Sequence, residues 1–288
     1  MILVTGANGH FGKATLAALL KKGAAPNTLA GLVRSPEKGA FLADWGVEAR
    51  IGDFNDYASL EEVFKGVDQL VLVSTTELDR RAEQQIQAVR AAKEAGVKHI
   101  LYTSVDRSEE RDESPIALIN DSHIATEKAI KASGIPYTIL RNNLYTDALP
   151  MFLGEKVLET GVFVPAGEGK VGFVLREEMA EATANILLSE GHENKDYAFS
   201  HPEPVSFGEI AEILSEVSGK PVGYVSPDRA TYLGVLAAAG VPEIYAEITT
   251  GFSEAIAQGL FAGSGSDIEV LLGRKPTEVR VFLEKVYA

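Results

Sequence analysis

The stretch that decides the fold is Ile2-Leu3-Val4-Thr5-Gly6-Ala7-Asn8-Gly9-His10-Phe11-Gly12. It joins a short apolar run to three glycines spaced G-x-x-G-x-x-G, and a helical pattern follows from Lys13 to Lys22. Glycines at this spacing permit a tight turn and let the backbone approach a pyrophosphate at the N-terminus of the helix. A strand before the turn and a helix after it make the spacing more specific. The stretch therefore predicts a dinucleotide-binding turn, with a structural glycine turn as the alternative.

Around this turn, the first half of the chain alternates short β-branched runs with longer amphipathic stretches. Parallel strands joined by right-handed helical crossovers give this alternation. The clearest helical stretch runs from Arg80 to Ala95, and Gly96 follows it. We therefore expect an α/β fold with a doubly wound parallel sheet, a Rossmann domain over residues 1–145. Its six expected strands are Ile2 to Thr5, Leu29 to Val33, Val47 to Ile51, Gln69 to Val73, His99 to Thr103 and Tyr137 to Leu140.

Residues 146–288 follow a different rhythm of longer helices and short strands. Ser206 followed by Glu209 is a capping box, in which the hydroxyl and the carboxylate each accept from a free amide at the helix start. We expect a smaller α+β lobe that binds the substrate, with an approximate boundary that the chain can cross again. The glycine-rich segment from Phe163 to Gly172 is either part of the connection or a loop over the site. The expected helices are 177–190, 206–218, 228–239, 242–258 and 277–287.

The composition disfavours several classes of protein. Lys plus Arg number 27 and Asp plus Glu 41, so 27 − 41 gives a net charge of −14, which argues against nucleic-acid or membrane binding. The absence of cysteine excludes disulfides and thiol nucleophiles. The five histidines show no close pair with metal-ligand spacing, so we expect no metal. The first residues lack the basic and apolar regions of an export signal. We expect a cytoplasmic protein, either a monomer or a homodimer.

The end of the second strand indicates which cofactor is bound. NAD-type sites place a carboxylate here for the ribose hydroxyls, but this strand is followed by Arg34-Ser35-Pro36-Glu37-Lys38. A guanidinium can stack on adenine and donate two hydrogen bonds to a 2′-phosphate, and a lysine adds a second cation. Arg34 and Lys38 therefore favour NADPH, unless they belong only to a solvated helix start.

Polar loops follow the next two strands at the same edge of the sheet. Asp53 and Phe54 follow the third strand, and Ser74, Thr75 and Thr76 follow the fourth. The carboxyl ends of the strands line the ligand crevice of such a sheet. Asp53 is placed to accept from the adenine amino group, and small hydroxylated residues suit close passage of the cofactor. We predict that both loops bind the cofactor, with ordinary loop chemistry as the alternative.

Four segments make the chain resemble the atypical short-chain dehydrogenases/reductases and, within them, the NmrA-like group. They are Thr5 to Gly12, Val33 to Lys38, Tyr102-Thr103-Ser104 and Leu140-Arg141-Asn142-Asn143-Leu144-Tyr145. Together they are similar to NADPH-dependent quinone oxidoreductases and triphenylmethane reductases. The resemblance implies that NADP(H) is bound by the glycine turn, Arg34, residues 74–76, Asn142, Asn143 and Tyr145.

One element of the wider superfamily is missing. Typical members carry Tyr-x-x-x-Lys, in which the tyrosine protonates a carbonyl oxygen and the lysine lowers the tyrosine pKa. Here Ile124 stands at the tyrosine position and Lys128 is retained. An ordinary alcohol dehydrogenase is therefore disfavoured. The resemblance implies hydride transfer to a small planar electrophile that needs no protein acid, a quinone before a triphenylmethane dye. A non-catalytic NADP(H)-sensing regulator is the alternative.

Residues near the expected active site supply the remaining candidates. Asn142 is the first choice for an orienting catalytic residue, because it ends the sixth strand at the crevice. Ser104 stands where the superfamily has an active-site hydroxyl, but without a neighbouring base we expect it only to form hydrogen bonds. We predict that Ser104 and Lys128 are both cofactor-binding residues. His123 is the histidine best placed to replace the missing acid, with a structural or helix-start role as the alternative.

Two further groups have more than one interpretation. Tyr145, Phe152 and Phe173 form either an aromatic wall for a flat substrate or part of the core. The acidic run from Glu109 to Glu113 is either a solvated loop or a flank of the site that favours a cationic or neutral substrate.

Overall fold

The computed structural model describes residues 1–107 and 114–288, and its centre is a parallel sheet of seven strands. The strand order is β3-β2-β1-β4-β5-β6-β9. Strands β2 and β3 are added on one side of β1, and the later strands are added on its other side, beginning with β4. Ligands of such sheets bind beyond the carboxyl ends of the strands, at the point where the strand order reverses. The acidic run from Glu109 to Glu113 lies outside the described residues. The strands are β1 (Ile2–Val4), β2 (Leu29–Val33), β3 (Glu48–Ile51), β4 (Gln69–Leu72), β5 (His99–Val105), β6 (Tyr137–Asn142) and β9 (Lys195–Phe199).

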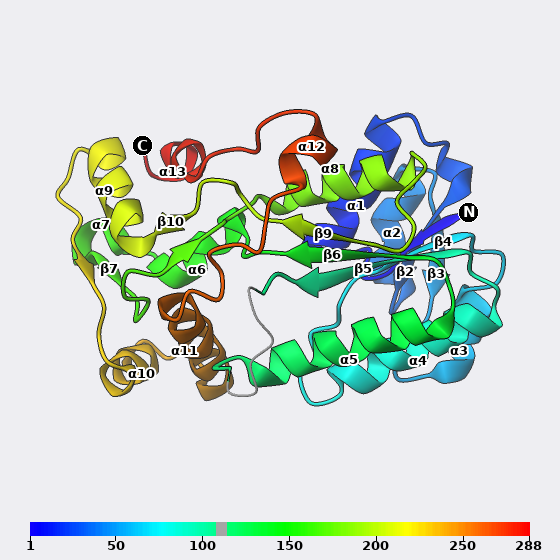
Figure 1. The fold of residues 1–288 in the computed structure, drawn as a ribbon, viewed down its shortest axis with the longest axis horizontal. Coiled ribbons are helices and arrows are strands. Elements are labelled where there is room, and N and C mark those ends of the chain that lie inside the picture. Colours follow the sequence, from blue (N-terminus) through cyan, green and yellow to red (C-terminus); the bar gives the residue numbers. More distant parts are fainter. Residues whose placement is uncertain (108–113) are drawn as a thin grey trace.

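Helices cover both faces of this sheet (Figure 1). One layer contains α1 (His10–Lys21), α2 (Pro36–Asp44), α8 (Arg176–Leu187) and α12 (Ile268–Leu272). The other contains α3 (Tyr57–Val63), α4 (Arg81–Glu94) and α5 (Ala117–Ser133). Each layer buries its own apolar core against the sheet. The prediction of a doubly wound α/β fold is confirmed.

The chain returns to the large sheet after residue 145. Helix α8 packs on α1, and β9 pairs in parallel with β6, so Tyr197 lies opposite Leu140. Strand β9 is not among the strands predicted from the sequence, because its first residues, Lys195 and Asp196, are exposed and give no apolar run. Residues 176–199 therefore belong structurally to the sheet, although they follow the expected domain boundary.

The second lobe lies beyond the carboxyl ends of the strands (Figure 1). The predicted capping box is present: Ser206 Oγ accepts from the Glu209 amide at 3.1 Å, and the Glu209 carboxylate accepts from the Ser206 amide at 2.6 Å. The lobe has its own apolar core. Its helices are α6 (Leu149–Leu153), α7 (Val157–Thr160), α9 (Phe207–Ser218), α10 (Arg229–Ala238), α11 (Glu243–Ala257) and α13 (Val279–Tyr287). Its strands are β7 (Val162–Phe163), β8 (Lys170–Val171), β10 (Val205–Ser206) and β11 (Tyr224–Val225).

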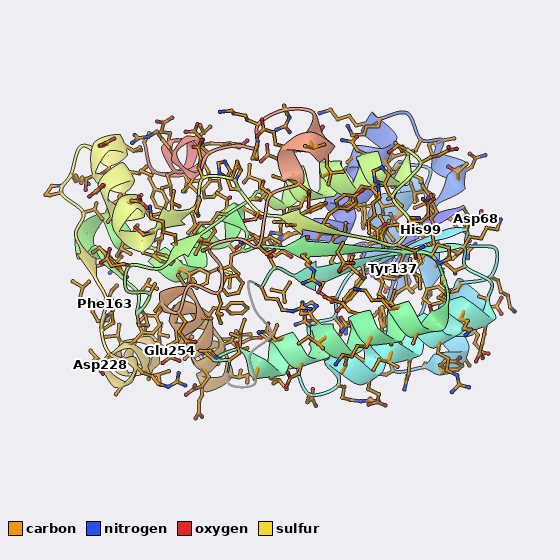
Figure 2. The ribbon with its side chains drawn as sticks, in the orientation of Figure 1. Asp68, His99, Tyr137, Phe163, Asp228 and Glu254 are labelled. Atoms are coloured by element: carbon orange, nitrogen blue, oxygen red, sulfur yellow. The ribbon has the colours of Figure 1, made fainter. Side chains whose placement is uncertain are left out.

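The glycine-rich segment from Phe163 to Gly172 is a structural part of this lobe. It contains residues of β7 and β8, which pair with β11 and β10. The rings of Phe163 and Tyr232 lie 6.2 Å apart. Figure 2 shows Phe163 close to Asp228, at the end of the molecule opposite His99. Within the described ranges, no helix combines the length and apolar character that a membrane crossing requires.

Candidate functional site

The glycine turn packs so closely against the start of α1 that a side chain would not fit at Gly12. Gly6 has a φ of +58°, in the left-handed region that glycine favours. A Cβ on Gly12 would lie 2.4 Å from the Gly6 carbonyl oxygen, so α1 begins directly against the turn. Gly9 precedes α1, and no side chain in the described ranges caps the helix start. The first amides of α1 are therefore free to bind a phosphate.

A cavity at the carboxyl ends of the strands gathers many of the predicted cofactor residues. Its wall contains Arg34 after β2, Asp53 and Phe54 after β3, and residues 74–76 after β4. The Asp53 carboxylate accepts from the Asn55 amide at 2.8 Å, which orders this loop. The other lining residues are Gly6, Asn8, Gly9, Leu32, Val33, Val73, Glu77 and Gln84.

Arg34 brings an accessible positive charge to this cavity. Its side chain is 61% exposed, and the carboxylate of Glu77 lies 3.8 Å away. Glu77 also accepts from the Gln84 amide at 2.6 Å. An exposed ion pair of this kind contributes little to stability, so a phosphate can compete with Glu77 for the guanidinium. Lys38, by contrast, is exposed on α2 and is absent from the wall of this cavity and of the second one described next.

A second cavity shares Gly6, Gly9 and residues 74–76 with the first, so the two are halves of one crevice. Part of its wall comes from the second lobe, where α11 supplies Ile244, Tyr245 and Ile248. Ile244 is 56% exposed and Tyr245 62%, which leaves apolar surface open to the crevice. These residues are not among those predicted from the sequence. The other lining residues are His10, Phe11, Gly12, Val73, Leu78, Asp79, Arg81, Thr103, Tyr145 and Arg176.

Tyr145 is the one member of the predicted aromatic wall that lines the crevice. The Arg176 guanidinium lies 5.1 Å from the centroid of its ring. Burial raises the pKa of the Tyr145 phenol, so the hydroxyl keeps its proton at neutral pH. Phe152 and Phe173 pack instead against Phe207 in the core of the second lobe. For these two residues, the core interpretation is correct.

Ser104 and Lys128 are not brought together at the crevice. The Ser104 hydroxyl donates to Glu127, which also accepts from Arg107 at 3.0 and 2.9 Å. Arg141 lies 3.5 Å from the same carboxylate. Ser104 is therefore part of a buried ion-pair cluster. Lys128 is exposed on α5, and both residues are absent from the walls of the two cavities.

The two asparagines after β6 have different surroundings. Asn142 is 4% exposed, and neither atom of its amide has a hydrogen-bond partner among the described residues. The Asn143 amide donates to Asp106 at 3.2 Å, to Ser200 at 3.1 Å and to the Phe261 carbonyl at 3.1 Å. Neither asparagine lines the two cavities. The role of Asn142 stays a prediction. Asn143 has a structural role, because its hydrogen bonds connect the sheet to residues in the second half of the chain.

His123 is buried behind the crevice in a chain of hydrogen bonds. The Arg81 guanidinium lies 2.8 Å from its Nε2, and the Tyr102 hydroxyl lies 2.8 Å from its Nδ1. A guanidinium only donates, so Nε2 accepts and the proton of the neutral ring is assigned to Nδ1. Tyr102 then accepts from Nδ1 and donates to Gln85 Oε1 at 3.3 Å. The expectation that His123 replaces the missing acid is therefore not met, because its proton is directed away from the crevice.

This buried histidine predicts a pH dependence of stability. Burial, followed by the charges of Arg81 and Arg107, holds the pKa of His123 well below its ordinary value of 6.5. The pKa of His123 is lower in the folded protein than in the unfolded chain. The contribution of neutral His123 to the free energy of unfolding is therefore fully present above about pH 6.5 and is lost as the pH falls below that value. We expect His123→Gln to flatten the fall in unfolding free energy between about pH 6.5 and 5, by up to about 1.4 kcal/mol per pH unit. Urea unfolding across this range measures the slope, with pH 8 as the reference. Equal slopes for both proteins would contradict the assignment.

Comparisons with known proteins agree with this architecture. The NmrA-like family matches residues 1–281. Quinone oxidoreductase 2 of Escherichia coli (strain K12) is 34% identical over 278 residues, which cover 96% of this chain and 95% of that protein. An NAD(P)H azoreductase of Xenophilus azovorans is 29% identical over 249 residues, covering 86% of this chain and 84% of that one.

Two solved structures are similar over the whole length. The Citrobacter sp. triphenylmethane reductase complexed with NADP(H) has a TM-score of 0.92 at 40% identity, with 100% of both chains covered. An NADPH-dependent quinone oxidoreductase of Escherichia coli complexed with NADPH has a TM-score of 0.91 at 31% identity, also with 100% of both chains covered. The resemblance found in the four sequence segments is thereby confirmed, and this chain belongs to the NmrA-like family.

Proposed function

We propose that this protein is an NADPH-dependent oxidoreductase that transfers hydride to a planar electrophilic acceptor such as a quinone. The observation that carries the proposal is the crevice, which joins an uncapped helix start and a guanidinium to an exposed apolar helix face. The relatives named above, a quinone oxidoreductase, an azoreductase and a triphenylmethane reductase, support it. Because these are oxidoreductases, the alternative of a cofactor-sensing regulator has less support.

The first half of the crevice fits the cofactor. The free amides at the start of α1 bind the pyrophosphate, and Gly12 allows the close packing that this requires. Arg34 donates to the 2′-phosphate, and Asp53 accepts from the adenine. Residues 74–76 border the passage between the two halves. Bound NADPH supplies the hydride for the reaction.

The second half suits a flat acceptor with apolar faces. Ile244, Tyr245 and Ile248 line the same cavity as the glycine turn, and covering them removes apolar surface from water. The tyrosine acid of the wider superfamily is replaced by Ile124. A quinone or a cationic triphenylmethane dye is electrophilic enough to accept hydride without that acid, and a reduced quinone oxygen can take its proton from water. Asn142 remains the proposed orienting residue, because its buried amide has no partner in the described structure.

The direct test is steady-state oxidation of NADPH with a small panel of quinones and one cationic triphenylmethane dye. We expect turnover with at least one quinone, and the loss of NADPH absorbance measures its rate. Titration of cofactor fluorescence in the same samples gives the Kd for NADPH. Tight cofactor binding without turnover of any acceptor would overturn the proposal and favour a regulator.

Arg34→Asp is expected to weaken binding of NADPH far more than binding of NADH. The exposed guanidinium lines the cofactor cavity, and a charge-assisted contact with the 2′-phosphate contributes on the order of 1.5–3 kcal/mol. The Kd for NADPH should therefore rise by about 10- to 150-fold, as measured by fluorescence titration. Lys38→Asp is the matched charge reversal at a position outside the cavity wall, and its effect should be smaller. Equal losses for NADPH and NADH in Arg34→Asp would remove Arg34 from the phosphate.

A further inference from the structure

Arg81 is a cation in the crevice for which cofactor binding gives no role. It begins α4 and lines the second cavity together with Thr103 and Tyr145. Its Nη2 contacts His123, while its Nε is buried and has no hydrogen-bond partner among the described residues. Buried donors in native proteins nearly always have an acceptor, because an unsatisfied one is costly. The buried Nε is therefore a donor whose acceptor the described residues do not supply.

Among the residues that the structure describes, the charge of Arg81 also has no carboxylate partner. No carboxylate oxygen of residues 1–107 or 114–288 lies within 4.0 Å of its guanidinium. The other arginine in the same wall, Arg176, is paired with Asp147 at 2.6 Å. The preceding residue, Arg80, is paired with Glu83 at 3.0 Å. Burial lowers the pKa of Arg81, but a guanidinium remains protonated in proteins. Arg81 thus brings to the crevice a positive charge that has no ion-pair partner among the described residues.

A directed hydrogen-bond chain holds this guanidinium in place. Arg81 donates to His123, and His123 donates to Tyr102, as the tautomer assignment requires. Tyr102 donates to Gln85 Oε1, which also accepts from the Thr75 amide at 3.2 Å. The chain therefore connects Arg81 with the loop of residues 74–76, which borders both halves of the crevice. One donor of Arg81 is used by the chain, and its other N–H groups remain for a ligand.

We propose that Arg81 contacts the acceptor oxygen of a quinone and stabilises the negative charge that forms on it. This inference rests on the proposed function. In hydride transfer, the C–H bond of the reduced cofactor breaks and its electron pair moves with the hydrogen to the quinone. One quinone oxygen becomes an anion, NADPH becomes NADP⁺, and a proton from water completes the hydroquinone. A donor fixed beforehand at such an oxygen accelerates reactions by about 100-fold or more.

A cationic dye separates this role from a structural one. Hydride adds to the central carbon of a triphenylmethane cation and neutralises it, so no oxygen anion forms. A nearby guanidinium repels such a substrate instead of stabilising its product. Arg81 should therefore favour quinones over cationic dyes. Damage to the fold or to the cofactor site would lower the reduction of both.

The test compares Arg81→Gln with the wild-type full chain on a small benzoquinone and on one cationic triphenylmethane dye. We expect kcat/KM for the quinone to fall by about 100-fold, while kcat/KM for the dye is unchanged or higher. The Kd for NADPH should stay unchanged in fluorescence titrations. Arg81→Lys retains a charge and should recover part of the quinone activity. Arg80→Gln, an exposed arginine one residue away, is the matched control and should leave both activities unchanged.

Two outcomes would overturn the inference while leaving the proposed function intact. Equal losses with quinone and dye would show that Arg81 acts on structure. A large loss of NADPH affinity would assign Arg81 to the cofactor. If the wild-type protein reduces neither acceptor, the proposed function itself fails, and this is seen before any variant is compared.

Discussion

Gly12→Ala is expected to weaken NADPH binding strongly and to destabilise the fold. A Cβ at this position would lie 2.4 Å from the Gly6 oxygen and 3.0 Å from the Thr5 oxygen, and neither backbone atom can rotate away. Overpacking typically costs about 1–3 kcal/mol, and we expect the upper end here. A shift of α1 also withdraws its free amides from the pyrophosphate. Each charge-assisted hydrogen bond that is lost costs about 1.5–3 kcal/mol, so the Kd for NADPH should rise by more than about 100-fold.

The matched control is Gly234→Ala, another glycine-to-alanine change in a helix. Gly234 is exposed on α10, and its added Cβ meets no heavy atom within 4 Å. Alanine is the better helix former, so the free energy of unfolding of this variant should be about 0.5–1 kcal/mol higher, and NADPH binding should be normal. Urea unfolding and cofactor fluorescence measure both variants. Unchanged NADPH affinity in folded Gly12→Ala would mean that the turn does not hold the pyrophosphate.

The central sheet is largely predictable because its inner strands are buried on both faces. Ile2–Val4 and Leu29–Val33 are buried at every position, and such strands produce continuous apolar runs in the sequence. Strand β9 lies at the edge of the sheet and begins with the exposed residues Lys195 and Asp196. No local pattern marks it as a strand. Its place follows from pairing with β6 and from the packing of α8 on α1, which are contacts between distant parts of the chain.

The candidate site is predictable where topology alone brings residues together. The loops after parallel strands share one edge of the sheet, so Arg34, Asp53 and residues 74–76 meet in one cavity. Arg81 and the α11 residues are missed, because helical periodicity does not reveal which cavity a helix end or face meets. Lys128 shows that a residue retained at a motif position need not line the site. On α5, His123 and Glu127 are four residues apart and both are buried, whereas Lys128 is exposed.

Glu127→Ala is expected to lower the free energy of unfolding by about 3–5 kcal/mol, because it removes one partner of a buried ion pair. The side chain of Glu127 is 7% exposed and that of Arg107 only 3%. The carboxylate accepts from Ser104, Arg107 and Arg141, and all three lose this acceptor in the variant. Urea unfolding at neutral pH measures the loss. Glu62→Ala, which breaks an exposed pair with Lys65, is the matched control and should cost less than about 1 kcal/mol.

The same variant also separates a structural role of this cluster from a chemical one. Ser104 and Glu127 lie outside the walls of both cavities, so the fraction of Glu127→Ala that remains folded should bind NADPH and reduce quinone at a nearly normal rate. Glu127→Gln keeps the shape of the side chain without its charge and should fall between wild type and Glu127→Ala in stability. If instead turnover is lost while the unfolding free energy is unchanged, the Ser104 hydroxyl and its carboxylate take part in the reaction. The position of the superfamily's active-site hydroxyl would then have kept a chemical role, with Glu127 as its partner in place of a tyrosine and a lysine.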